Sequence, residues 1–227
     1  MTTIAILPVK SFGAAKQRLA PALGAGARQA LAQAMFSDVL GSLRHVPGLD
    51  AIAVVTADEV AESAALGERV RVLRDSEEGG QSRAAAIGIR HAVAAGFERV
   101  LLVPADTPLL DPAELAGLLE RAPDVAIVPD RHGTGTNALL LRPPDAIEPS
   151  FGPGSFERHV RAAETAGVAY SAEPVPSLLL DVDTAADLAE LATTLEERRT
   201  RAPLTRGALR QLNRARAREG PAVRAPV

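Results

Sequence analysis

Short apolar runs alternate along this chain with longer, alanine-rich segments whose apolar residues recur with a helical period. The apolar runs predict strands at 3–9, 51–56, 70–74, 99–104, 125–129, 138–142 and 178–182. The periodic segments predict helices at 27–45, 82–95, 112–121, 155–166 and 185–199. Because strands and helices take turns, we expect an α/β fold with a mostly parallel, mixed sheet flanked by helices.

The length and composition of the chain suit one domain followed by a tail. Of its 227 residues 47% are apolar, which is enough for one well-filled α/β domain, and we place that domain at 1–195. The segment 196–227 contains nine arginines and three glutamates together with prolines and glycines. It is predicted to be a basic, weakly folded, flexible extension that is either simply solvated or serves an oligomer contact or an anionic ligand.

Charge and composition exclude several classes of protein. The net charge of -3 and the pI near 5.9 argue against nucleic acid as the main partner. The absence of cysteine excludes disulfides and thiolate metal sites. No apolar stretch is long enough to span a membrane and the N-terminus does not read as a secretory leader, so we expect a soluble, cytoplasmic protein with no membrane partner.

Three cations follow the first predicted strand, namely Lys10, Lys16 and Arg18. Ligands of open α/β sheets bind at the carboxyl ends of the strands, and this spacing surrounds a phosphate chain better than it follows one helix face. The stretch is therefore a candidate polyanion site, with a solvated basic loop as the alternative.

Carboxylates also occur at the ends of two other apolar runs. Asp106 comes after the run that begins at 99, and Asp111 before Pro112 is the better helix cap, which leaves Asp106 for another task. Asp181 lies near the end of the predicted strand 178–182 and Asp183 follows it, and the two side chains share a face if that strand persists. If the two strands are neighbours, Asp106 and Asp183 can hold Mg²⁺, which prefers carboxylates and substrate phosphates. The alternative is that Asp183 caps the next helix.

Glycines mark three further segments. Gly79 and Gly80, followed by Gln81 and Ser82, allow a backbone to approach a base or ribose, although Ser82 could also be a plain helix cap. The pattern is neither the phosphate loop of NTPases nor the dinucleotide fingerprint. The segments 130–137 and 150–159 supply hydroxyls and free N–H groups beside a predicted helix start, together with His132 and His159. Such groups suit the binding of a small carboxylate or phosphate. The alternative is that both segments are structural turns.

Several of these motifs, in this order, resemble the guanylyltransferase family of coenzyme F-420 biosynthesis. The resemblance covers about residues 1–195 and is carried by the residues at 8–10, 15–19, 104–110, 130–137, 151–155 and 181–184. It implies the nucleotide-diphospho-sugar transferase fold, a GT-A, Rossmann-like architecture. The family often has a Gly-Leu-Asn-like segment where this chain has Gly80, Gln81 and Ser82, so the resemblance assigns no guanine-reading residue.

The resemblance also implies a reaction and a set of site residues. The expected enzyme transfers GMP from GTP to phosphoenolpyruvate, or to 2-phospho-L-lactate, and releases pyrophosphate. Its expected partners are these small molecules and the next enzyme of the coenzyme F-420 pathway. A homodimer is compatible with the chain. Mg²⁺ would be held by Asp106 and Asp183. The phosphates of GTP would lie against Lys10, Lys16 and Arg18 near the loop 79–82. The acceptor would be held by Thr136, Gly152 and Ser155.

Two other functions remain open at this point. A related transferase could activate a molybdopterin or a sugar acid with CTP or GTP, and small glycine-rich pockets favour the small acid over the pterin. A non-catalytic nucleotide-binding domain would bind nucleotide without releasing pyrophosphate, and it would leave both aspartates at the strand ends unexplained.

Overall fold

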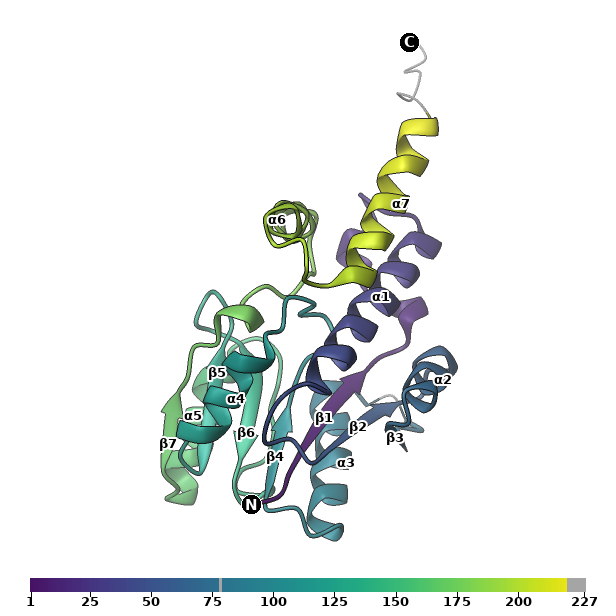
Figure 1. The fold of residues 1–227 in the computed structure, drawn as a ribbon. Coiled ribbons are helices and arrows are strands. Elements are labelled where there is room, and N and C mark those ends of the chain that lie inside the picture. Colours follow the sequence, from purple (N-terminus) through teal and green to yellow (C-terminus); the bar gives the residue numbers. More distant parts are fainter. Residues whose placement is uncertain (78, 220–227) are drawn as a thin grey trace.

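A computed structural model describes residues 1–77 and 79–219 of the chain (Figure 1). Its centre is a seven-stranded mixed sheet in the order β3-β2-β1-β4-β6-β5-β7. The strands β1 to β4 are parallel, and β6 runs antiparallel to both β4 and β5. Their bounds are Thr3–Val9 (β1), Ala51–Thr56 (β2), Arg71–Arg74 (β3), Arg99–Leu102 (β4), Val125–Pro129 (β5), Thr136–Leu141 (β6) and Tyr170–Ala172 (β7).

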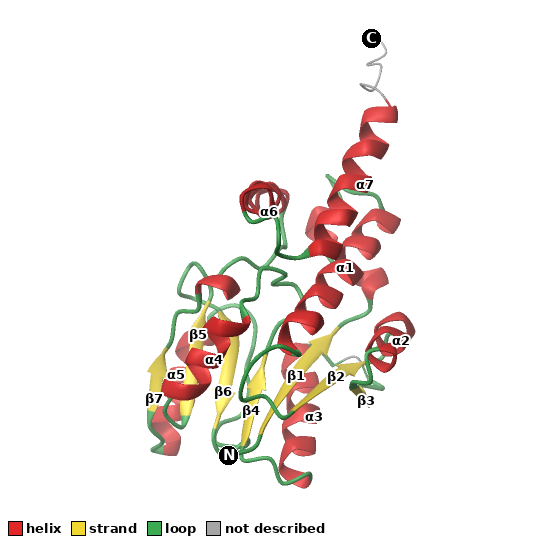
Figure 2. Ribbon diagram, in the orientation of Figure 1, coloured by secondary structure: helices red, strands yellow, loops and turns green. Residues whose placement is uncertain are grey.

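Helices cover both faces of this sheet (Figure 2). One apolar cluster joins the sheet to α1, α2 and α4, and a second joins the opposite face to α3 and α5. At Gly88 of α3 an added Cβ would lie 2.3 Å from Ile6 of β1, so only glycine allows this close approach. The helices are Ala25–Leu43 (α1), Glu59–Gly67 (α2), Gln81–Ala94 (α3), Pro112–Arg121 (α4), Ser155–Ala166 (α5), Ala185–Glu197 (α6) and Pro203–Glu219 (α7).

The α/β prediction is confirmed, but one predicted strand is wrong. Residues 178–182 form no strand; a short 3-10 helix, Pro176–Leu178, leads into an irregular segment. The place beside β5 is taken by β7, which the sequence did not predict. Leu180 and Val182 are buried instead in a third apolar cluster, beneath α6. Their apolar character therefore reflects packing against helices and not pairing in the sheet.

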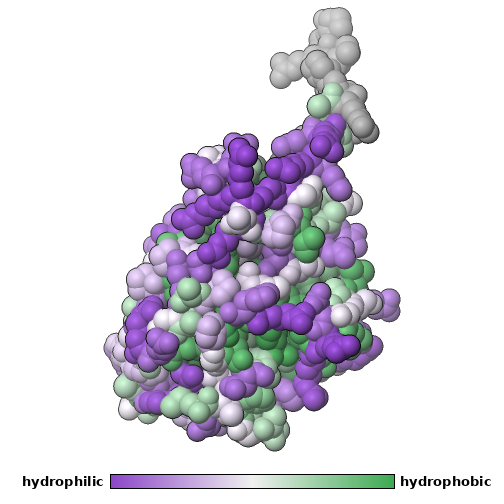
Figure 3. Space-filling view, in the orientation of Figure 1, coloured by the Kyte–Doolittle hydropathy of each residue, from purple (hydrophilic) through white to green (hydrophobic). Residues whose placement is uncertain are grey.

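The prediction of a weakly folded extension from residue 196 is wrong for residues 203–219, which form α7. This helix packs on α1, and Ala202, Thr205 and Leu209 make a buried stripe at helical spacing. The carboxylate of Asp38 in α1 accepts hydrogen bonds from the first N–H groups of α7. Figure 3 shows a hydrophilic surface around α7, and Arg210 and Arg214 of this helix are exposed. Residues 220–227 lie outside the described residues.

Among the described residues, no helix is both long and apolar enough to cross a membrane.

Candidate functional site

A cavity of about 510 Å³ opens at the carboxyl ends of the four parallel strands. This is the edge at which open α/β sheets bind their ligands. The loops after β1, β2, β3 and β4 and the segment before α6 line it. All three predicted cations (Lys10, Lys16 and Arg18) and both predicted metal ligands (Asp106 and Asp183) are among the lining residues.

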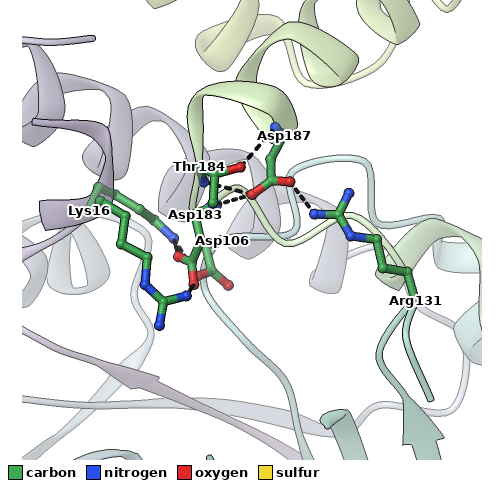
Figure 4. Close-up of polar contacts among 7 residues, drawn as sticks. Lys16, Asp106, Arg131, Asp183, Thr184 and Asp187 are labelled. Atoms are coloured by element: carbon green, nitrogen blue, oxygen red, sulfur yellow. Dashed lines mark hydrogen bonds and ion pairs between the residues drawn. The ribbon is translucent and has the colours of Figure 1, made fainter. Parts of the chain in front are cut away.

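Lys16 lies between the two carboxylates (Figure 4). Its Nζ is 2.5 Å from Asp106 Oδ2 and 2.9 Å from Asp183 Oδ1, and its side chain is only 7% exposed. The backbone N–H of Val182 also donates to the carbonyl of Asp106, at 3.3 Å, which ties the two acidic segments together. The backbone, not a strand at 178–182, thus brings Asp106 and Asp183 to one place.

The charges of this cluster balance one another. Burial by itself would lower the pKa of Lys16, but the charges of Asp106 and Asp183 and their hydrogen bonds raise it to about 12. The neighbouring Asp181 is partly buried, and burial and the charge of Asp106 raise its pKa. Arg18 lies at the rim, 77% exposed, with Nη1 3.9 Å from Asp183 Oδ2. The pair of carboxylates is a built site for a positive charge.

Two residues that the sequence reasoning missed hold Asp183 in place. Asp187 Oδ2 accepts hydrogen bonds from the backbone N–H groups of Asp183 and Thr184, at 3.0 and 2.6 Å, and its other oxygen accepts from Arg131. Burial would raise the pKa of Asp187, but these hydrogen bonds, that of Arg131 first, lower it. Thr184, not Asp183, caps α6 in a reciprocal capping box with Asp187. That box could have been read from the Thr-x-x-Asp spacing.

The donor set fits Mg²⁺. No group of three or more metal-ligating side chains gathers among the described residues, so the chain offers no complete metal cage. Mg²⁺ is normally held by one or two carboxylates, with water and substrate phosphates completing six ligands. Asp106 and Asp183 supply two carboxylates and face the cavity in which phosphates would lie.

The loop predicted to contact the nucleotide divides in two. Gly80 and Gln81 line the cavity, and Gly80 caps α3 with a φ of 90°, which favours glycine. Gly79 packs against Arg83 and is not a lining residue. Ser82 is not the cap; its Oγ accepts a hydrogen bond from the backbone N–H of Phe151 at 2.8 Å. It joins the nucleotide side of the site to the glycine-rich segment before α5.

The three predicted acceptor residues form a second cluster next to this cavity. Thr136 begins β6, and because β6 is antiparallel to β4 it lies at the same edge of the sheet as Asp106. Ser155 begins α5, and its backbone N–H donates to the carbonyl of Gly152 at 3.0 Å. The Oγ of Ser155 is buried and has no hydrogen-bond partner among the described residues. None of the three lines the cavity.

The sequence suggested that His159 could help to bind an anion, but both of its ring nitrogens are engaged within this second cluster. It is completely buried. The N–H of Ser150 donates to Nε2 at 2.9 Å, so Nε2 must be the unprotonated nitrogen and Nδ1 carries the proton. Nδ1 lies 2.9 Å from Thr136 Oγ1 and donates to it. The hydroxyl proton of Thr136 is thereby left free to donate to a ligand.

Acidification should expose the dependence of the fold on neutral His159. Burial, with the charge of Arg158, lowers its pKa from 6.5 to about 4. As the pH falls, His159 of the unfolded chain is protonated near pH 6.5, whereas His159 of the folded chain stays neutral until about pH 4. The stability that neutral His159 contributes is therefore complete above pH 6.5 and is lost as the pH falls toward 4. We expect this titration of His159 to lower the free energy of unfolding by about 3 kcal/mol. The free energy of unfolding, measured with urea at several pH values from 6.5 to 4, should fall more steeply with decreasing pH for the wild type than for His159→Asn. An equal pH dependence for the two proteins would contradict the assignment of His159 as neutral and buried.

With this geometry established, comparison with known proteins becomes specific. Residues 3–215 match the family described as "Guanylyl transferase CofC like". The chain belongs to this family. It is 50% identical over 218 residues to the phosphoenolpyruvate guanylyltransferase of Conexibacter woesei, covering 94% of this chain and 98% of the relative. It is 39% identical to the 2-phospho-L-lactate guanylyltransferase of Methanothermobacter thermautotrophicus, covering 84% of each chain. This guanylyltransferase family member is therefore a nucleotidyltransferase.

The solved structures agree with the family on the fold. A structure from Desulfovibrio desulfuricans G20, assigned to the nucleotide-diphospho-sugar transferases, superposes with a TM-score of 0.75 at 20% identity, covering 94% of this chain and 96% of the other. The predicted nucleotide-diphospho-sugar transferase fold is confirmed.

Proposed function

We propose that this protein transfers GMP from GTP to phosphoenolpyruvate, with Mg²⁺, and releases pyrophosphate and enolpyruvyl-2-diphospho-5'-guanosine. The observation that carries the proposal is the cluster of Lys16, Asp106 and Asp183 in a cavity at the carboxyl edge of the sheet. The similarity over nearly the whole chain to a relative named for phosphoenolpyruvate supports this acceptor. The next enzyme of coenzyme F-420 biosynthesis would consume the product.

The chemistry requires positioning and charge compensation. A phosphate monoester has a second pKa of about 6 and is largely ionised at neutral pH, so its oxygen can attack the α-phosphorus of GTP without a general base. Lys10, Lys16 and Arg18 neutralise the charge that develops on the departing pyrophosphate. Asp106 and Asp183 would hold Mg²⁺, which when bound polarises the phosphoryl oxygens.

The second cluster would hold the acceptor. The N-terminus of α5 carries partial positive charge, which favours an anion there, although the backbone N–H groups of Ser155 and Phe156 already donate to the carbonyls of Gly152 and Thr134. The unpartnered Oγ of Ser155 and the hydroxyl proton of Thr136 supply two donors for that anion. The acceptor's carboxylate and phosphate would lie between this cluster and Asp106.

One relative supports a second acceptor, 2-phospho-L-lactate, which differs from phosphoenolpyruvate at the carbon that carries the phosphate. The experiment is pyrophosphate release from GTP and Mg²⁺ with phosphoenolpyruvate, 2-phospho-L-lactate or 3-phosphoglycerate, with pyrophosphatase present to draw the equilibrium forward. We expect the highest kcat/KM with phosphoenolpyruvate. Equal or higher turnover with 2-phospho-L-lactate would overturn the choice of acceptor, and no turnover with any of the three would overturn the reaction.

A further inference from the structure

Asp75 has a buried carboxylate oxygen with no hydrogen-bond partner in residues 1–77 and 79–219. It is the first residue after β3, and its backbone N–H donates to the carbonyl of Thr56 at 3.1 Å. The residue is 6% exposed, and its Oδ1 has no hydrogen-bond partner among the described residues. Leaving a buried acceptor unpaired costs free energy, so such a group calls for an explanation.

The other buried carboxylates show what a structural role looks like here. Among the described residues, Asp38 and Asp187 are the other two buried acids. Both oxygens of Asp38 accept from backbone N–H groups at the start of α7. Asp187 accepts from two backbone N–H groups and from Arg131. Asp75 has no such task, and Gly80, not Asp75, caps the helix that follows.

The position of Asp75 puts it at one end of the nucleotide cavity. It lines the same cavity as Asp106 and Asp183, together with Gly80 and Gln81. In the sheet order β3-β2-β1-β4, Asp75 follows β3 whereas Asp106 follows β4, three strand spacings away. At about 4.8 Å for each spacing this is roughly 14 Å, a length that a nucleoside and its first phosphate can span.

We propose that Asp75 reads the guanine of GTP, an inference that rests on the proposed function. A nucleotide whose α-phosphate lies at Lys16, Asp106 and Asp183 would extend its base toward the β3 end of the cavity. Guanine presents two adjacent donors there, N1–H and the 2-amino group, and a carboxylate presents two acceptors in matching positions. Adenine and cytosine offer an acceptor at the position of N1–H, so the same carboxylate would repel them.

Gly80 supports this placement of the base. Gly80 lines the same cavity as Asp75, and an ideal Cβ built at Gly80 would meet none of the described atoms within 4 Å, so the cavity wall at Gly80 leaves room for a ligand. A ribose hydroxyl could also donate to Asp75, and that role would be indifferent to the base. The two assignments are separated by changing the base while the ribose and phosphates stay the same.

The test is Asp75→Asn with GTP and xanthosine triphosphate, measured as Kd by calorimetry with Mg²⁺ and as kcat/KM for pyrophosphate release. Asparagine keeps one acceptor and replaces the other by a donor, which suits xanthine, because xanthine has a carbonyl where guanine has its amino group. We expect GTP to bind on the order of 10²-fold more weakly, and the variant to prefer xanthosine triphosphate. An equal loss for both nucleotides, or no change, would overturn the assignment.

Two controls keep the test decisive. Asp124→Asn makes the same change in an ion pair just before β5, a strand separated from β3 by four others, and should leave both affinities unchanged. If Asp75→Asn does not fold, the wild type is tested with inosine triphosphate, which lacks the 2-amino group: binding at least 10-fold weaker than GTP supports the proposal, and equal binding overturns it. A wild type that binds no GTP would instead contradict the proposed function.

Discussion

Asp106→Asn should reduce pyrophosphate release by on the order of 10³–10⁴-fold, because a bound metal supplies several kcal/mol of transition-state stabilisation. The amide keeps the shape of the side chain but loses the charge that would hold Mg²⁺. Lys16 keeps its ion pair with Asp183, so the cluster is not left with an unpaired lysine. The measurement is kcat at increasing Mg²⁺, and the loss should be only partly relieved at high metal concentration.

Controls separate this effect from misfolding. The variant should retain the wild-type circular dichroism spectrum and unfold cooperatively. Asp111→Asn changes an acid only five positions further along, which caps α4 and forms an ion pair with Arg201. Asparagine caps a helix as well as aspartate, so the variant should lose only the stability that this ion pair contributes, and little turnover. An Asp106→Asn enzyme that kept full Mg²⁺-dependent turnover would remove the basis of the proposed metal site.

Lys16→Gln is expected to change catalysis and metal binding in opposite directions. Turnover should fall on the order of 10³-fold, because the departing pyrophosphate loses a positive charge in a partly desolvated site. The affinity for Mg²⁺ without nucleotide should rise, because the ammonium group no longer competes for Asp106 and Asp183. The two carboxylates also lose their counter-charge, so the metal-free variant should be less stable than the wild type.

Thermal unfolding with and without Mg²⁺, together with calorimetric titration of Mg²⁺, measures these effects. The metal should raise the melting temperature of Lys16→Gln more than that of the wild type, because a ligand at concentration L that binds the folded state adds RT ln(1 + L/Kd) to the free energy of unfolding, and this quantity grows as Kd falls. Arg142→Gln removes an exposed ion pair with Asp124, away from the cavity, and should change neither quantity. If Lys16→Gln bound Mg²⁺ more weakly than the wild type, competition between the ammonium group and the metal would be disproved.

Much of the site was predictable because its residues follow apolar runs. The strands at 3–9, 51–56 and 125–129 agree with β1, β2 and β5, and the acid and the cations that follow such runs fall at one edge of the sheet. The pairing of Asp106 with Asp183 was predicted on the wrong ground. It depends on a backbone hydrogen bond between loops and not on neighbouring strands.

Other features could not be predicted, because local composition does not show what will pack against a segment. The basic segment after 196 resembles a solvated tail, yet small and apolar residues at helical spacing allow α7 to lie on α1. The roles of Asp187 and Arg131 depend on partners more than fifty positions apart. Asp75 does not differ in sequence from any other acid after a strand, and only its burial and missing partner distinguish it.

The sequence by itself determined the alternation of strands and helices, the family motifs and the types of charge that meet at the strand ends. These are consequences of side-chain periodicity and of residue chemistry, which act over a few neighbouring positions. Only the tertiary structure decided which carboxylates are neutralised, which one is left without a partner, and which tautomer His159 adopts. Burial and hydrogen bonding depend on residues that are distant in the chain and adjacent in the fold.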